Sequence, residues 1–215
     1  MSDKSNKYGY VGVDIPAQSF GSNKGVFNPA EINELVADNK WTTFGQLELI
    51  ETQTASSDSA LNFTSIDEST YNVHFMTINN IDVSNDNADM NFRLYESGVL
   101  ETASVYQFAY QQQWADGFVN DGKTTGLSYL KATSSIGNDT NETGQAYHYF
   151  YNLGDSSKYS FQTAQYLQLY STSTMFVGFG SGVLPQTSTV DGIQLYSSAG
   201  TFSGTANLYG IKEYS

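Results

Sequence analysis

Two histidines, one serine-containing segment and a scatter of acids are the residues of this chain whose types could do acid–base or nucleophilic chemistry. His74 and His148 are the only histidines, and each lies in a stretch that alternates like a β-strand. Neither has an acidic neighbour in a spacing typical of a catalytic site. The Gly-Asp-Ser segment at 154–156 offers a nucleophile, but such a serine needs a histidine base within hydrogen-bond reach. We therefore interpret this segment as a turn between strands.

Metal and glycosidase chemistry find little more support. The chain has no cysteine, and two histidines 74 residues apart do not form a ligand pattern for a transition metal. The segment SNDNAD at 84–89 offers oxygen ligands for Ca²⁺ but lacks the central glycine and the distal glutamate of an EF-hand loop. A glycosidase needs two carboxylates, and no spacing among the 22 acids marks a pair. We expect no catalytic residue, no metal site and no cofactor, so the prediction is a protein that is not an enzyme.

The composition indicates a turn-rich β protein. The 215 residues include 16 tyrosines, 13 phenylalanines and 19 glycines but only 3 prolines, whereas a helical bundle would be richer in alanine, leucine, glutamate and lysine. The 22 acids outweigh 9 bases, which gives a formal net charge of −13. Such a charge repels phosphate backbones and anionic lipid, so we expect neither nucleic acid nor membrane insertion. The N-terminus lacks the apolar stretch of a signal peptide, and we expect synthesis in a cytoplasm.

The chain divides into three regions of different character. Residues 1–27 carry isolated large apolar residues between glycines, a pattern that favours an extended arm packed against another surface. Residues 28–41 predict a capped helix and linker, with Asn28 as N-cap and an apolar stripe that includes Val36. Residues 42–215 change to a period of two and predict the main domain. The arm residues that we expect at an assembly contact are Tyr10, Ile15, Phe20 and Phe27.

The main domain is predicted to be all-β. Short stretches with apolar residues at every second position, without alternating helices, indicate an antiparallel β-sandwich, with a jelly roll as the favoured version. The stretch 104–114 fits both a helix and a strand, and we predict a strand. Segments 84–89, 115–126 and 134–144 are expected to be turn-rich connections, and GFGSG at 178–182 a glycine-kinked strand.

Two sets of surface residues are candidates for binding. The last strand is apolar on both faces, so Tyr209 and Ile211 need a cover that a neighbouring subunit would supply. The stretch 146–153 places Tyr147, Tyr149 and Tyr151 on one side together with Leu153. With Trp114 from a loop, these tyrosines are the candidates for a sugar-binding face, although ordinary sheet packing explains them as well.

Two segments resemble structural proteins of marine tailed phages, especially those that infect cyanobacteria. The first is GYVGVDIPAQSFGSNKGVFNPAEINELVADNKW at 9–41, and the second is TFSGTANLYGIK at 201–212, which fits a closing pattern F-x-G-T-x-x-L-Y-G-[VI]-K. The matching positions of the closing pattern are Phe202, Gly204, Thr205, Leu208, Tyr209, Gly210, Ile211 and Lys212. In that group a short arm and a helix precede a β-sandwich.

The resemblance implies a virion component, either a head decoration or a tail or fibre protein, located in the virion and bound to other virion proteins. A homo-oligomer follows from the residues, and a trimer is favoured by analogy with that group. The alternative function is a carbohydrate-binding module that recognises a host surface glycan.

Overall fold

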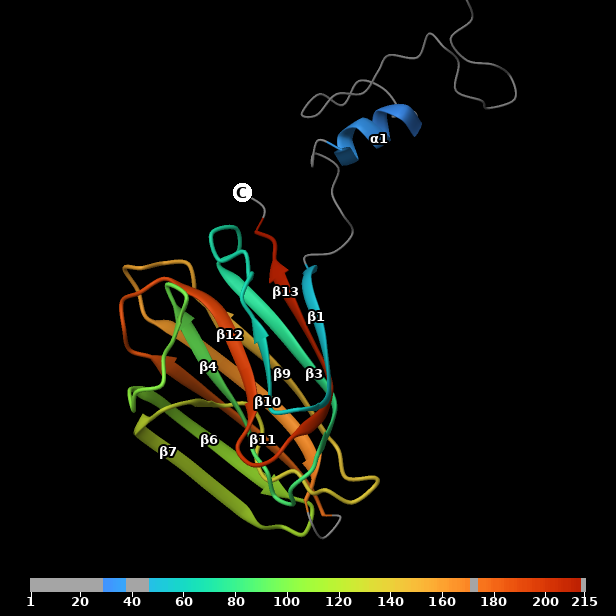
Figure 1. Cartoon of the computed structure of the whole chain (residues 1–215), viewed down its shortest axis with the longest axis vertical. Coiled ribbons are helices and arrows are strands. Elements are labelled where there is room, and N and C mark those ends of the chain that lie inside the picture. The colour runs from blue at the N-terminus through green and yellow to red at the C-terminus, as the bar shows by residue number, and fades with distance from the viewer. Residues whose placement is uncertain (1–28, 38–46, 171–173, 214–215) are drawn as a thin grey trace, which may run out of the picture. The chain divides into compact units, whose positions relative to one another are not determined.

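The computed structural model describes residues 29–37, 47–170 and 174–213, and the chain divides into two units, 1–45 and 46–215. In the first unit the described element is helix α1, Pro29–Ala37 (Figure 1), so the predicted short helix is confirmed. Val36, assigned to the apolar stripe, is 51% exposed. The predicted arm at 1–27 lies outside the described residues, and with it the candidates Tyr10, Ile15, Phe20 and Phe27.

The second unit is the predicted all-β sandwich of two antiparallel sheets (Figure 1). The larger sheet has the strand order β1-β13-β3-β9-β10-β11-β6-β7, and the smaller has the order β2-β12-β4-β5 with β8 also paired to β4. The strands are β1 Leu47–Asp58, β2 Ala60–Phe63, β3 Val73–Val83, β4 Met90–Glu96, β5 Val99–Leu100, β6 Tyr106–Trp114, β7 Val119–Leu127, β8 Leu130–Lys131, β9 Gly144–Tyr151, β10 Ser160–Leu169, β11 Met175–Leu184, β12 Val190–Ser197 and β13 Phe202–Ile211.

The strand pairing is nested, as in a jelly roll. β1 pairs with β13 and β2 pairs with β12, so the first two strands of the sandwich lie beside the last two. β13 is therefore an inner strand of the larger sheet, flanked by β1 and β3. Its inward side chains Ala206 and Leu208 are fully buried, while Tyr209 and Ile211 lie half-buried on the other face.

The sequence analysis missed four strands, the short β2, β5 and β8 and the longer β7. Segment 115–126 was expected to be a connection, but most of it belongs to β7, which forms the edge of the larger sheet and pairs with β6. As an edge strand, β7 is less buried on both faces than the inner strands, so it does not need apolar residues at every second position. Its polar residues on both faces therefore removed the signal that identified the predicted strands.

Alternation directs one side of each strand into a core between the sheets. Phe150 of β9 meets Phe92 of β4 edge to face, with ring centroids 5.2 Å apart, and so joins the two sheets. Leu153 was expected on the tyrosine side of β9 but is fully buried. The chain leaves the strand after Tyr151, and the left-handed φ of 62° at Asn152 turns the following residue toward the core.

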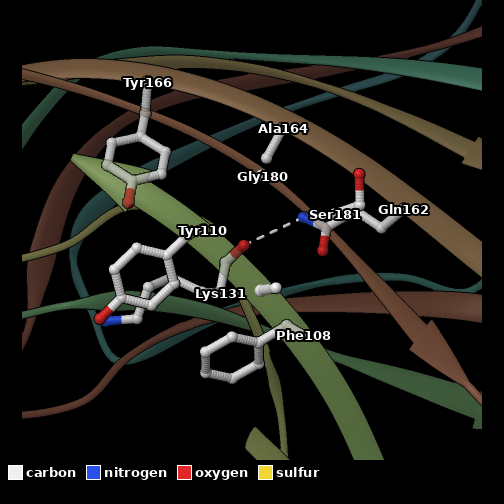
Figure 2. A pocket seen from close by; sticks show the side chains of 9 residues that line it. Phe108, Tyr110, Lys131, Gln162, Ala164, Tyr166, Gly180 and Ser181 are labelled. Carbon is white, nitrogen blue, oxygen red and sulfur yellow. Dashed lines mark hydrogen bonds between the residues drawn. The ribbon is translucent and has the colours of Figure 1, made fainter. Parts of the chain in front are cut away.

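Glycines on the inner face of the larger sheet make room for tyrosine rings. Tyr166 of β10 lies opposite Gly178 of β11, and a methyl group at Gly178 would come within 2.1 Å of that ring. Tyr110 of β6 lies opposite Gly122 of β7 in the same way. Figure 2 shows the rings of Tyr166 and Tyr110 near Gly180, around a cavity of about 10 Å³. The GFGSG segment is thus a regular part of β11 whose glycines accept neighbouring side chains.

We predict that Gly178→Ala lowers the free energy of unfolding by about 1–3 kcal/mol, because the methyl group must displace the buried Tyr166 ring. Urea denaturation measures this change. Gly126→Ala is the matched control, since the nearest atom to its added methyl group lies 3.6 Å away, and it should change stability little. Equal effects of the two substitutions would contradict the role of Gly178.

Candidate interaction surface

The outer face of the larger sheet gathers five aromatic rings from three strands. Tyr147, Tyr149 and Tyr151 of β9 alternate with buried residues and point away from the core. Strand register places Phe75 of β3 directly opposite Tyr149 on one side and Tyr209 of β13 on the other. We call these five residues the aromatic cluster.

The rings of the aromatic cluster contact one another through Phe75. Its ring centroid lies 4.8 Å from that of Tyr149, 6.1 Å from Tyr209 and 6.2 Å from Tyr147. Tyr149 and Tyr151 stack at 6.4 Å. These distances are those of favourable aromatic pairs, so the cluster forms one continuous ring surface.

Aliphatic side chains extend this surface toward the edge strand β1. Leu49 lies opposite Tyr209 and Leu47 lies opposite Ile211. Leu49 is 59% exposed and Leu47 is 49% exposed. An apolar patch that continues across four neighbouring strands is unusual for a surface that meets only water.

Amides and hydroxyls fill the outer face beside the rings. The Tyr147 hydroxyl donates to Gln165 Oε1. The Asn207 side-chain amide donates to Thr77 Oγ1 at 3.1 Å and accepts from Thr52 Oγ1 at 2.8 Å. A groove of about 250 Å³ lies where β3, β9 and β10 adjoin, and its lining includes Phe75, Thr77, Asn79, Gln145, Tyr147, Gln165 and Leu167.

The centre of the outer face carries no charge in the part of the chain that the structure describes. Its six inner strands present tyrosine, phenylalanine, aliphatic, amide and hydroxyl side chains only, although the chain has a formal net charge of −13. The outward positions are every second residue of 73–79, 107–113, 145–151, 161–169, 175–183 and 205–211. The acids of this protein are therefore absent from the middle of its largest sheet face.

The structure brings together two sets of candidates that the sequence treated separately. Tyr209, proposed for assembly, and the three tyrosines of β9, proposed for ligand binding, belong to one aromatic cluster. Trp114 does not join them. It ends β6 on the core side, where its ring stacks on Phe176 with centroids 4.4 Å apart, so a site shared with those tyrosines is not formed.

Both histidines point into the core. His74 Nε2 lies 2.7 Å from the carbonyl oxygen of Ile66, and His148 Nδ1 accepts a hydrogen bond from the Gln162 amide at 2.9 Å. Burial lowers the pKa of His74, and it lowers the pKa of His148 to about 3. The two imidazoles are therefore neutral near pH 7 and have no contact with solvent.

Acidic side chains form local contacts away from the aromatic cluster. The carboxyl groups of Glu96 and Glu101 hydrogen-bond to each other. Burial raises the pKa of Glu96, while the Ala103 backbone N–H lowers the pKa of Glu101. Their direct contact leaves no room for the sugar that separates the two carboxyls of a glycosidase.

The other polar segments that the sequence singled out are also held by their neighbours. Asp155 in the Gly-Asp-Ser turn accepts hydrogen bonds from Ser157 and pairs with Lys158. Asp89, at the end of the SNDNAD segment, pairs with Lys131 at 2.8 Å. Arg93 donates to the Ser128 carbonyl and lies over the Tyr196 ring. No group of three metal-ligating side chains occurs among the described residues.

Phe75, Leu47 and Leu49 are members of this surface that sequence reasoning did not select. Each was visible as an outward position of an alternating stretch. Their spatial neighbours, however, are distant in the sequence. Phe75 and its neighbour Tyr149 are 74 residues apart, and Leu49 and its neighbour Tyr209 are more than 150 residues apart. Only the strand order shows that these positions are adjacent.

No family model, curated protein or solved structure matches the chain. Within the described ranges, no helix has the length and apolar character needed to cross a bilayer.

We predict that acid destabilises the fold through His148. The folded pKa of about 3 lies below the unfolded value of about 6.5, so only the unfolded chain binds the proton between these values. The free energy of unfolding should therefore fall as pH drops below about 6.5, by up to ~1.4 kcal/mol per pH unit for each buried histidine. His74 acts in the same direction.

The measurement is urea denaturation between pH 6.5 and 5 on the parent protein and on His148→Asn, so that carboxyl groups such as Glu96, whose pKa burial raises, contribute equally to both slopes. His148→Asn should be less stable at pH 7 but show a shallower dependence on pH, and should keep its assembly state. A variant with the slope of the parent protein would show that His148 is not the titrating group.

Proposed function

We propose that this chain is a non-enzymatic structural protein of a phage particle, which assembles through the outer face of its larger sheet. The observation that carries the proposal is the uncharged aromatic and aliphatic surface on a chain with a formal net charge of −13. The resemblance of both ends of the chain to virion proteins of marine tailed phages supports a role in a particle, as a head decoration or a tail or fibre component.

The charge distribution favours a second copy of this chain as the partner that binds the outer face of the larger sheet. Two copies with the same negative charge repel each other unless the surfaces that meet are neutral. The interface cores of proteins are depleted in charge and enriched in tyrosine and phenylalanine, as the aromatic cluster is. A homotrimer is the favoured state, by analogy with the resembling virion proteins.

The energy of such an interface is adequate only if several side chains contribute. Full burial of a large apolar side chain is worth about 1.5–3 kcal/mol, so a half-exposed one such as Leu49 contributes ~1 kcal/mol. Association costs about 4–15 kcal/mol. On the order of ten side chains are needed, and the aromatic cluster with Leu47, Leu49 and Ile211 on each of two subunits supplies that number.

The alternative function is a carbohydrate-binding module that recognises a host surface glycan. The groove at Phe75 and Tyr147 favours it, because aromatic rings beside the amides of Gln145 and Gln165 suit a sugar ring and its hydroxyls. A glycan that competes with self-association at this groove would favour the alternative over the assembly interface.

We predict that Leu49→Asp converts the assembled protein to a monomer. The substitution places a carboxylate in a neutral contact, and symmetry repeats it in every subunit. Light scattering after gel filtration measures the mass. Val99→Asp is the control, because Val99 is 70% exposed on the smaller sheet and the substitution adds the same charge. A monomeric parent protein, or equal masses for the two variants, would refute the interface.

We also predict that deletion of residues 1–27 leaves a folded sandwich that attaches poorly to the particle. The apolar residues of this segment are too widely spaced by glycine to build a core of their own, so their burial requires another surface. Circular dichroism checks the fold, and copy number on purified particles checks attachment. Normal copy number would show that the segment is not the anchor.

A further inference from the structure

A second hollow lies on the outer face of the larger sheet, over β10, β11, β6 and β7 rather than over the aromatic cluster. Its volume is about 650 Å³, within the range of ligand sites. We call it the trough. Its lining residues are Gln107, Phe108, Ala109, Lys123, Thr124, Thr125, Phe161, Ser181, Gly182 and Val183.

The trough exists because small side chains are aligned across neighbouring strands. Ser181 of β11 lies opposite Ala109 of β6, which lies opposite Lys123 of β7. The parallel row two residues away holds Phe161 of β10 opposite Val183. Small residues thus form the floor, Phe161 and Val183 form a wall, and Lys123 ends the row at the sheet edge.

Lys123 is the basic side chain without a partner in the described part of the chain. Lys131, Lys158 and Lys212 pair with acids at 2.8–2.9 Å. Arg93 donates to a carbonyl and lies over a tyrosine ring. In a chain with 22 acids and 9 bases, a lysine left unpaired beside a hollow is available for a ligand anion.

We propose that the trough binds a saccharide that carries a single carboxylate. The Phe161 ring, 45% exposed, offers a flat apolar surface to the C–H face of a sugar ring. Gln107, Ser181 and Thr125 offer amide and hydroxyl groups to its hydroxyls. Lys123 pairs with the carboxylate through a charge-assisted hydrogen bond.

The charge of the chain limits the ligand to one anionic group. A polyanion such as a polyuronate would place further carboxylates along a surface of an acidic protein, with no second free lysine in the trough to receive them. A single carboxylate at Lys123 avoids this repulsion. At physiological salt the repulsion falls off over a distance of about 8 Å.

The trough and the assembly interface lie on different strands of the larger sheet. The trough lies on β10, β11, β6 and β7, whereas the aromatic cluster and the two leucines lie on β1, β13, β3 and β9. Phe161 lies opposite Tyr151, so the two surfaces adjoin at β9 and β10. Leu49→Asp is therefore expected to change the assembly state and to leave saccharide binding intact.

A glycan array probed with the full chain tests the proposal. The array contains neutral oligosaccharides, their sialylated or singly uronylated counterparts, and oligogalacturonates. We expect the bound members to be singly acidic, with affinity at least about tenfold above that of the neutral parent, measured by titration calorimetry. An array without bound saccharides overturns the proposal, and equal affinity for neutral and acidic members overturns the role of Lys123.

Two variants and two matched controls place the ligand in the trough. Lys123→Gln should remove the preference for the acidic saccharide over its neutral parent. Phe161→Ala should weaken the binding of both saccharides about tenfold. Lys158→Gln removes the same charge from another exposed lysine, and Tyr159→Ala removes a ring that is also 45% exposed; neither should change binding. Light scattering confirms that all four keep the parent mass. Binding unaffected by Lys123→Gln and Phe161→Ala locates the ligand elsewhere and refutes the trough.

Discussion

The larger sheet of this protein carries apolar side chains on both faces, but the described residues 47–170 and 174–213 cover only one of them with a second layer. The smaller sheet packs against the inner face, where Phe92 and Phe150 meet and where Ala206 and Leu208 are fully buried. On the outer face, where these described residues add no second layer, the same strands expose an aromatic cluster and two leucines. Because apolar surface of this extent is costly in water, the need for a further cover underlies the proposed function.

The inner face shows how little space the sandwich leaves. Tyrosine rings occupy the volume above glycines on neighbouring strands, so the position of each ring depends on the absence of a Cβ across the sheet. The Gln162 amide at this depth donates to both His148 Nδ1 and the Lys131 carbonyl oxygen. Figure 2 shows the bond to the Lys131 carbonyl. This packing keeps both histidines neutral and uses the two residues best suited to acid–base chemistry for structure instead.

The outer face separates two kinds of surface within one sheet. Toward β1 it is aromatic and aliphatic without charge, which suits contact with an identical acidic subunit. Toward β7 small residues open a trough that ends at an unpaired lysine, which suits a small anionic ligand. A structural protein with both surfaces would assemble through one and bind a ligand through the other. Each surface arises from side chains at alternate positions of the same strands.

The sequence by itself determined the short helix, the period-two strands and the all-β sandwich, because these depend on local alternation and capping. It also assigned Tyr209 and the β9 tyrosines to outward positions. It missed the short strands β2, β5 and β8 and the edge strand β7, which lacks the apolar pattern. It also misplaced Leu153, which the turn at Asn152 redirects. Only the tertiary structure decided that Phe75 joins Tyr209 to Tyr149, that Trp114 lies on the core side and that Lys123 stands beside a hollow. Strand order and register bring together residues that are distant in sequence. Neither can be predicted from the apolar alternation within a single strand.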